Sequence, residues 1–203
     1  VGGIVGNIFN KFSESIKATV SQGFEAVKTY ELLEGNIAML MGQEALRADP
    51  TLFPNALAAA KAMGGEAEKL LGTFQKLAIE SPFTRDDIAA GFRIAQVYGF
   101  STAAAQRLTG VVTDLASAYN LQGSEIKDII LPIGQMQALG RVQLQDAKQL
   151  SQRGILVFDI WAKKLGTTKD KVQELISAGL LESNFAIQAL VEDSEKLMSG
   201  AAT

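Results

Sequence analysis

Apolar residues recur at every third or fourth position along the first part of the chain. This spacing places them on one stripe of a helix. Because no proline occurs before Pro50, the pattern predicts one helix of roughly forty residues, ending near 48. Gly23 and Gly35 each weaken such a helix by about 1 kcal/mol relative to alanine, and a break near Gly35 into two helices is the alternative. The stripe consists of Phe9, Phe12, Ile16, Val20, Phe24, Val27, Tyr30, Leu33 and Ile37.

After residue 48, residues that favour the start or the end of a helix occur more often along the chain. Pro50 and Pro54 favour the start of a short helix over LAAAKAM, which Gly64-Gly65 is predicted to stop. A second helix is predicted over 66–80, where Ser81-Pro82 ends it because the residue before proline is pushed out of the α region. The pattern therefore predicts a break at 49–54 and two helices up to residue 80.

Hydroxyl residues and glycines mark the remaining helices. Thr84 and Asp87 have capping-box spacing at the start of a helix over 85–98. Ser101, Ser124 and either Thr167 or Thr168 are predicted to cap later helices. Pro132 should kink its helix or restart it. The stops are Gly99, Asn120, Gly140, Gly154, Gly166 and Gly179, and the later helices cover 102–119, 125–139, 143–152, 156–165, 168–178 and 183–198.

These elements predict an all-α fold. It consists of a long N-terminal helix followed by a compact multi-helix bundle of about nine short helices joined by short turns. No alternation of apolar and polar residues is long enough to predict a strand. We divide the chain into a long amphipathic helix at 1–48, expected to mediate oligomerisation or docking, and a helical domain at 49–203. Trp161, the only tryptophan, is expected to anchor the core together with Phe158.

Composition narrows the function classes. Apolar residues make up 47 % of 203 residues, which is enough for a sizeable core, and the net charge is −3. The absence of histidine and cysteine removes disulfides, thiolate chemistry, the commonest metal ligand and the usual acid or base at neutral pH. No apolar run approaches the roughly 18 residues that a membrane-spanning helix needs. The opening VGGIVG is no signal peptide, and we interpret the chain as a piece of a larger protein.

An enzyme is the least favoured class. Asp86 and Asp87 are the tightest acidic pair, but adjacent helical residues point about 100° apart, so they favour a helix start over a catalytic pair. Neither Ser151 nor Arg153 has a base partner nearby in sequence, and no phosphate-binding or nucleophile-elbow motif occurs. We therefore predict no catalytic, cofactor-binding or metal-ligating residues, no cofactor and no small-molecule substrate.

A basic stretch between Arg141 and Lys171 keeps a DNA-binding alternative open. It holds seven basic and three acidic residues, and the helices on either side of GTTKD resemble a helix-turn-helix in length. The second of these helices, KDKVQELISAG, carries few groups that read base edges. Acidic residues also follow directly downstream. A solvated amphipathic face is the favoured interpretation.

The aromatic residues of the N-terminal stripe suggest an alternative, in which this helix binds a membrane surface. An interfacial helix requires a cationic polar face. Here each lysine is balanced by a glutamate, at Lys11, Lys17 and Lys28 against Glu14, Glu25 and Glu31. Packing against a partner helix is the better interpretation, so we expect self-association or docking into another protein.

The stretch from about Lys69 to Leu190 resembles the conserved domain of phage tail tape measure proteins. The resemblance rests on the order and glycine–leucine spacing of five segments. Ser81-Pro82-Phe83 is similar to the family's Thr-Pro-Phe, and Leu156 stands where the family usually has proline after Gly-Ile. The residues at 49–65 look inserted before the domain. The segments are FQKLAIESPF, DDIAAGFRIAQVYGF, LTGVVTDLASAYN, IGQMQALGRVQLQDAKQLSQRGILVFDIWAKKLG and TTKDKVQELISAGLLESNFAIQAL.

This resemblance implies a structural protein of a tailed phage or prophage. In such proteins a long helical region lies inside the tail tube, sets tail length during assembly and leaves ahead of the DNA. The implied partners are a second copy of the chain, tail tube, tip or baseplate proteins, and tail assembly chaperones. The implied location is the tail interior, and the host cytoplasm during assembly. Contact of the parent protein with nucleic acid or membrane is compatible with the family but is not indicated by these residues.

Overall fold

The protein has an all-α fold. The computed structural model describes residues 28–121 and 124–198, which form a helix over 28–48 and eight further helices. In these two ranges the only extended pairing is an isolated antiparallel bridge between Arg141 and Glu182. The fold class predicted from the sequence is confirmed. The eight helices are α2 (Ala56–Glu80), α3 (Arg85–Val97), α4 (Thr102–Ala118), α5 (Glu125–Leu139), α6 (Leu144–Gln152), α7 (Val157–Leu165), α8 (Lys169–Ser177) and α9 (Ser183–Met198).

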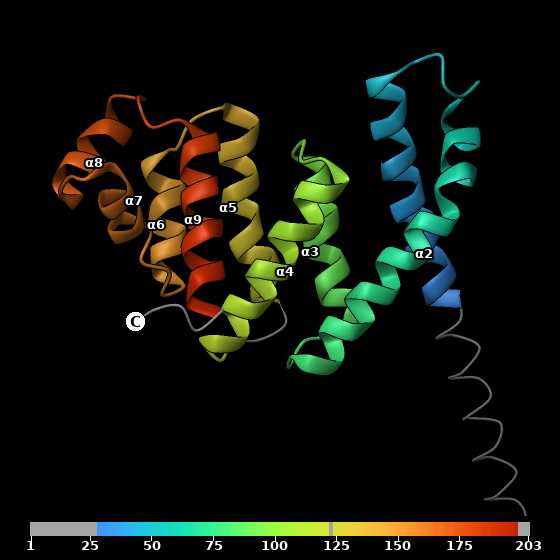
Figure 1. The fold of residues 1–203 in the computed structure, drawn as a ribbon, viewed down its shortest axis with the longest axis horizontal. Helices are drawn as coiled ribbons and strands as arrows, with labels where there is room; N and C mark the ends of the chain where they lie inside the picture. Colours follow the sequence, from blue (N-terminus) through green and yellow to red (C-terminus); the bar gives the residue numbers. More distant parts are fainter. Residues whose placement is uncertain (1–27, 122–123, 199–203) are drawn as a thin grey trace, which may run out of the picture.

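The helices follow one another across the molecule (Figure 1). The 28–48 helix and α2 lie side by side at one end, and α7 and α8 lie at the other. Helix α3 packs against α2, α4 and α5, and it therefore joins the first helix pair to the rest. Helix α9 returns across the bundle and packs against α4, α5 and α7.

The described part of the long N-terminal helix buries the predicted stripe. Leu33, Ile37 and Met41 are 7 %, 0 % and 9 % exposed and belong to the same core cluster as residues of α2–α9. The helix continues through Gly35, so the alternative break at that position is wrong. The predicted helical residues before 28 lie outside the described residues.

Side-chain caps form at three predicted positions. Thr84 and Asp87 make the full capping box, in which each side chain accepts the other's backbone N–H at 3.1 Å. Ser101 accepts from the backbone N–H of Ala104, and Thr168 accepts from that of Lys171. Each oxygen satisfies a backbone donor that has no partner within its helix. These predicted starts of α3, α4 and α8 are confirmed.

The predicted stops adopt the left-handed conformation. Asn120 has a φ of 55°, and it follows α4 directly after Tyr119. Glycine lacks a Cβ and reaches this conformation without strain, which explains its use at tight helix ends. The five predicted glycine stops also have positive φ: Gly99, Gly140, Gly154, Gly166 and Gly179.

The predicted stop at Gly64-Gly65 is wrong. Helix α2 runs without interruption from Ala56 to Glu80, so the two helices predicted there are one. Two internal glycines cost a helix only about 1 kcal/mol each. Burial of Ala59, Leu71 and Phe74 on both sides of the pair outweighs that cost. The merger explains why eight helices follow residue 48 instead of about nine.

Two predictions for α5 are corrected. Ser124 stands at the N-cap position but makes no side-chain capping hydrogen bond, because it already has helical angles of −63° and −22°. The helix also continues through Pro132 and does not restart. Pro132 and its neighbours Ile129 and Ile133 are buried, and this burial offsets the missing backbone N–H.

Candidate functional site

The acidic residues singled out in the sequence serve the fold. Asp87 belongs to the capping box, and Asp86 pairs with Arg85 at 3.4 Å. Arg153 binds Glu125 and Asp128, each at 2.8 Å, and so joins the end of α6 to the start of α5. Across the ranges 28–121 and 124–198, no group of three or more acidic residues could hold a metal ion. The pair at 86–87 is thus the helix start that the sequence indicated.

Ion pairs neutralise much of the basic stretch around GTTKD. Lys164 binds Glu192 at 2.6 Å, and this hydrogen bond holds the pKa of Glu192 below its usual value. Lys169 binds Asp159 at 2.6 Å. Lys171 binds Glu174 at 2.6 Å. A helix that reads DNA needs cations free to neutralise phosphates, so these contacts favour the solvated face over the helix-turn-helix alternative.

The described helices include no candidate for a membrane-spanning segment. None of those searched is long and apolar enough to cross a bilayer. The aromatic part of the N-terminal stripe, from Phe9 to Phe24, lies outside the described residues.

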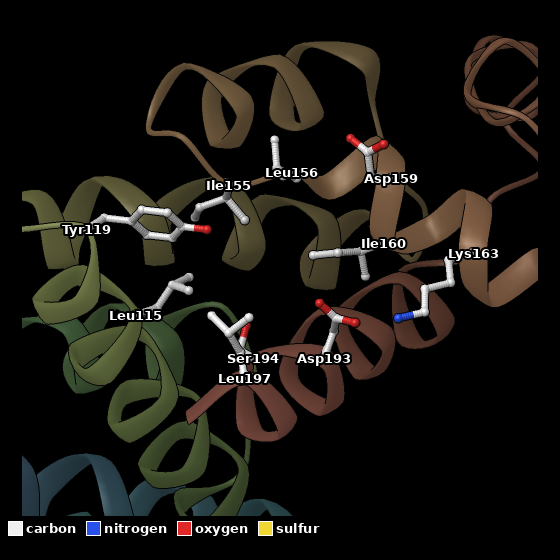
Figure 2. A pocket seen from close by; sticks show the side chains of 10 residues that line it. All are labelled: Leu115, Tyr119, Ile155, Leu156, Asp159, Ile160, Lys163, Asp193, Ser194 and Leu197. Carbon is white, nitrogen blue, oxygen red and sulfur yellow. The ribbon is translucent and has the colours of Figure 1, made fainter. Parts of the chain in front are cut away.

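An apolar groove lies on the surface of the bundle. It has a volume of about 220 Å³ and lies where the end of α4, the start of α7 and the end of α9 meet. Figure 2 shows its lining side chains converging from these elements. We call it the α4–α7–α9 groove. Its lining consists of Leu115, Tyr119, Ile155, Leu156, Asp159, Ile160, Lys163, Asp193, Ser194 and Leu197.

The turn before α7 sets one wall of the groove. Gly154 has a φ of 85° and ends the segment after α6. Ile155 then enters the core at 2 % exposure, which turns the next side chain, Leu156, outward at 61 % exposure. Leu156 is the N-cap residue of α7, so its backbone position is fixed by the helix that follows.

Trp161 holds α7 against α9 and so fixes the groove walls. It is fully buried, and its indole Nε1 donates to the carbonyl oxygen of Ala186 at 2.9 Å. Phe158 meets it edge-to-face, with ring centroids 6.1 Å apart. Such a pair stabilises by about 0.5–1.5 kcal/mol beyond the area it buries. The predicted role of Trp161 as a core anchor is confirmed.

Exposed apolar side chains lie at the mouth of the groove, and charged side chains lie on its rim. Tyr119 and Leu197 are 42 % and 48 % exposed. In the described part of the chain, neither Lys163 nor Asp193 forms an ion pair, whereas Asp159 is held by Lys169. A surface of this kind can bury the apolar side chains of a bound molecule, while the polar groups of the rim fix the orientation of that molecule.

The sequence did not predict that Tyr119, Leu156 and Leu197 lie together at the mouth of a groove. Tyr119 and Leu197 continue ordinary helical patterns, so nothing in their spacing shows that they are exposed. Leu156 was noted in the sequence only because the resemblance to tape measure proteins leads us to expect proline there. Its exposure shows that this departure adds an apolar side chain to the rim.

The described residues form a helical scaffold with an apolar groove where α4, α7 and α9 meet. The chain belongs to the tape measure protein family, because the family model described as tape measure protein matches residues 47–203. The match contains the segment near 69–190 that resembles the family and confirms that resemblance. Comparisons with curated proteins and with solved structures find no match. The family is structural, and its members belong to phage tails.

Proposed function

We propose that the region at 49–203 is a folded anchor of a tape measure protein inside the phage tail. Helical regions elsewhere in the parent then set tail length, and the protein leaves the tail ahead of the DNA. The observation that carries this proposal is the family match over residues 47–203, a range whose eight helices all contribute to one core. A compact domain cannot measure length by extension, so its role is to hold the ruler in place.

The proposed role is mechanical. Several of the described acids cap helices or pair with bases, and ion pairs join α6 to α5 and α7 to α9. Such contacts make a bundle rigid without preparing a reactive group. The proposed partners are tail tube, tip or baseplate proteins and tail assembly chaperones. The N-terminal segment is proposed to mediate self-association.

An in-frame deletion of 49–203 from the parent gene tests the anchor role. Electron microscopy of the encoding phage or prophage would count tails and measure their length. We expect far fewer complete tails, with those that form keeping their normal length. An extended helix rises about 1.5 Å per residue, so a ruler segment of this size would shorten the tail by about 230 Å. Normal numbers of shortened tails would contradict the anchor and assign this region to the ruler.

Ejection is tested on intact particles. Peptides from 49–203 should be present in purified tails by mass spectrometry and absent from particles that have released their DNA. A tail tube protein serves as the control, because it should stay in both samples. Retention of the 49–203 peptides in emptied particles would show that this region does not leave with the DNA.

A further inference from the structure

The α4–α7–α9 groove concentrates exposed apolar side chains from three separate elements. Leu156, Leu197 and Tyr119 are 61 %, 48 % and 42 % exposed and line one hollow. Single exposed apolar residues are ordinary, but a contiguous patch with a polar rim marks an interaction surface. The walls are preformed because Trp161 fixes α7 to α9. An occupant therefore gains apolar burial without first ordering the site.

The sequence of the chain itself contains a segment with matching chemistry. The 28–48 helix covers its part of the N-terminal stripe by burying Leu33 and Ile37 in the core. The same three- and four-residue spacing continues upstream through Phe9, Phe12, Ile16 and Val20. Apolar anchors at this spacing are those with which an amphipathic helix enters a groove. The upstream part of the stripe includes two large aromatic residues, and exposing such side chains to water is unfavourable in free energy.

The charges of the segment and of the rim are also compatible. Lys163 and Asp193 lie on the rim without an ion pair in the described ranges, so the rim offers one charge of each sign. Residues 9–20 carry Lys11 and Lys17 beside Glu14. A rim of mixed charge selects the direction of a bound helix more than it raises affinity.

We propose that residues 9–20 of one copy bind in the α4–α7–α9 groove of a second copy. This proposal rests on the proposed self-association through the N-terminal segment and names the surface that receives it. Figure 1 places the 28–48 helix at one end of the molecule, α4 near the middle, and α9 and α7 towards the other end. Each copy then donates its segment and accepts that of another copy at a separate surface. Such a heterologous contact builds chains or rings and not only pairs.

Two full-length variants separate the donor from the acceptor. Leu156→Asp places a charge in the groove at the N-cap of α7, where aspartate is favourable for the helix, so the fold should persist. Phe9→Ser with Phe12→Ser removes two anchors of the segment. Leu180→Asp is the matched control, because Leu180 is 67 % exposed and does not line the groove. Circular dichroism would establish that all variants remain helical, and Tyr119→Ser would replace Leu156→Asp if it does not.

Sedimentation velocity of each variant alone, and of the two mixed, gives the result. We expect the natural chain and Leu180→Asp to associate, and the groove and segment variants to be monomeric alone. Mixing those two should produce one-to-one dimers, since one supplies an intact segment and the other an intact groove. Association of Leu156→Asp alone would overturn the groove assignment and leave self-association standing. Association of the segment variant alone would show that the N-terminal segment is not what joins the copies, and a monomeric natural chain would overturn self-association altogether.

A fluorescent peptide of residues 7–26 provides an independent measurement. It should bind the full-length segment variant, whose groove is intact. Adding Leu156→Asp to that variant should weaken binding by about tenfold or more, the loss expected when a central apolar anchor contact is removed. Equal binding to both proteins would overturn the groove as the receiving surface.

Discussion

Glu44 in the 28–48 helix accepts a hydrogen bond from the backbone N–H of Thr102 at 2.8 Å. It also accepts one from the Thr102 hydroxyl, which in turn accepts from Gln96 Nε2 at 2.9 Å. Thr102 is the first residue of α4, so a carboxylate from a distant helix satisfies a donor at the positive end of α4. This contact fixes the 28–48 helix to the bundle.

A second contact attaches the other end of the same helix. The guanidinium of Arg85, the first residue of α3, lies over the Tyr30 ring at 4.9 Å from its centroid. Leu33, Ile37 and Met41 are buried between the two contacts. The 28–48 helix therefore takes part in the core of the domain, whatever the residues before it bind.

Replacing Glu44 with alanine should destabilise the protein by about 1–3 kcal/mol. The substitution removes a charged acceptor from two donors and leaves the Thr102 N–H without its partner. Urea denaturation would measure the change. Gln43→Ala is the control, because it changes the neighbouring residue without removing a hydrogen bond comparable to that of Glu44. Equal effects of the two substitutions would show that the Glu44 contact adds nothing to stability.

Truncation tests the division of the chain at residue 48. The segment 49–203 is predicted to fold alone as a helical monomer, since it contains eight helices that contribute to one core. We expect it to be less stable than 28–203 by several kcal/mol. Burial of each large apolar side chain contributes about 1.5–3 kcal/mol, and Leu33, Ile37 and Met41 are removed. Circular dichroism and urea titration would compare the two, and a mostly unfolded 49–203 would move the domain start to residue 28 or earlier.

Two glycines in the 28–48 helix should respond to alanine with opposite signs. A Cβ on Gly42 would lie 2.6 Å from the backbone nitrogen of Ala60 and 2.8 Å from the carbonyl carbon of Ala59, so α2 would have to move. We expect Gly42→Ala to cost about 1–3 kcal/mol. A Cβ on Gly35 meets nothing within 4 Å, and Gly35→Ala should stabilise the helix by up to about 1 kcal/mol. Thermal unfolding of both variants checks this, and a Gly42→Ala variant as stable as the natural chain or more stable would mean that the two helices do not approach closely at Gly42.

The local starts and stops of helices were predictable because their chemistry lies within a few residues. The Thr84–Asp87 box joins residues three positions apart, and the left-handed end at Gly166 depends only on its own missing side chain. The stop at Gly64-Gly65 was wrong because tertiary burial along α2 decided the outcome. Glycine permits a helix end but does not impose one.

The groove and the Glu44 contact were beyond prediction because both depend on distant packing. Glu44 and Thr102 are 58 positions apart, and a glutamate on a helix ordinarily faces solvent. Leu156 and Leu197 become neighbours only after Trp161 fixes α7 to α9. Periodicity identifies which residues are apolar on a face, but the exposure of that face depends on what packs against it.

Asp146 should make stability depend on pH in the direction opposite to that of Glu192 and Glu195. It is 4 % exposed, and its Oδ2 has no hydrogen-bond partner among the described residues. Burial raises its pKa above 3.8, although the backbone N–H of Gln143 opposes the shift. Protonated Asp146 therefore favours the folded state below pH 3.8, and this contribution is lost as pH rises through the raised pKa. Glu192 and Glu195 have lowered pKa values, because Lys164 and Arg107 bind them, so their contribution is lost as pH falls.

The difference between the natural chain and Asp146→Asn isolates this effect, since Glu192 and Glu195 are present in both. The unfolding free energy of the natural chain relative to the variant should be greatest below pH 3.8, decrease as pH rises from there, and level off above the raised pKa of Asp146. The total decrease measures the pKa shift, at about 1.4 kcal/mol per unit. Urea titrations at half-unit pH steps would give the curve. A difference that stays flat, or that increases with pH, would mean that Asp146 is not held in an environment that penalises its charge.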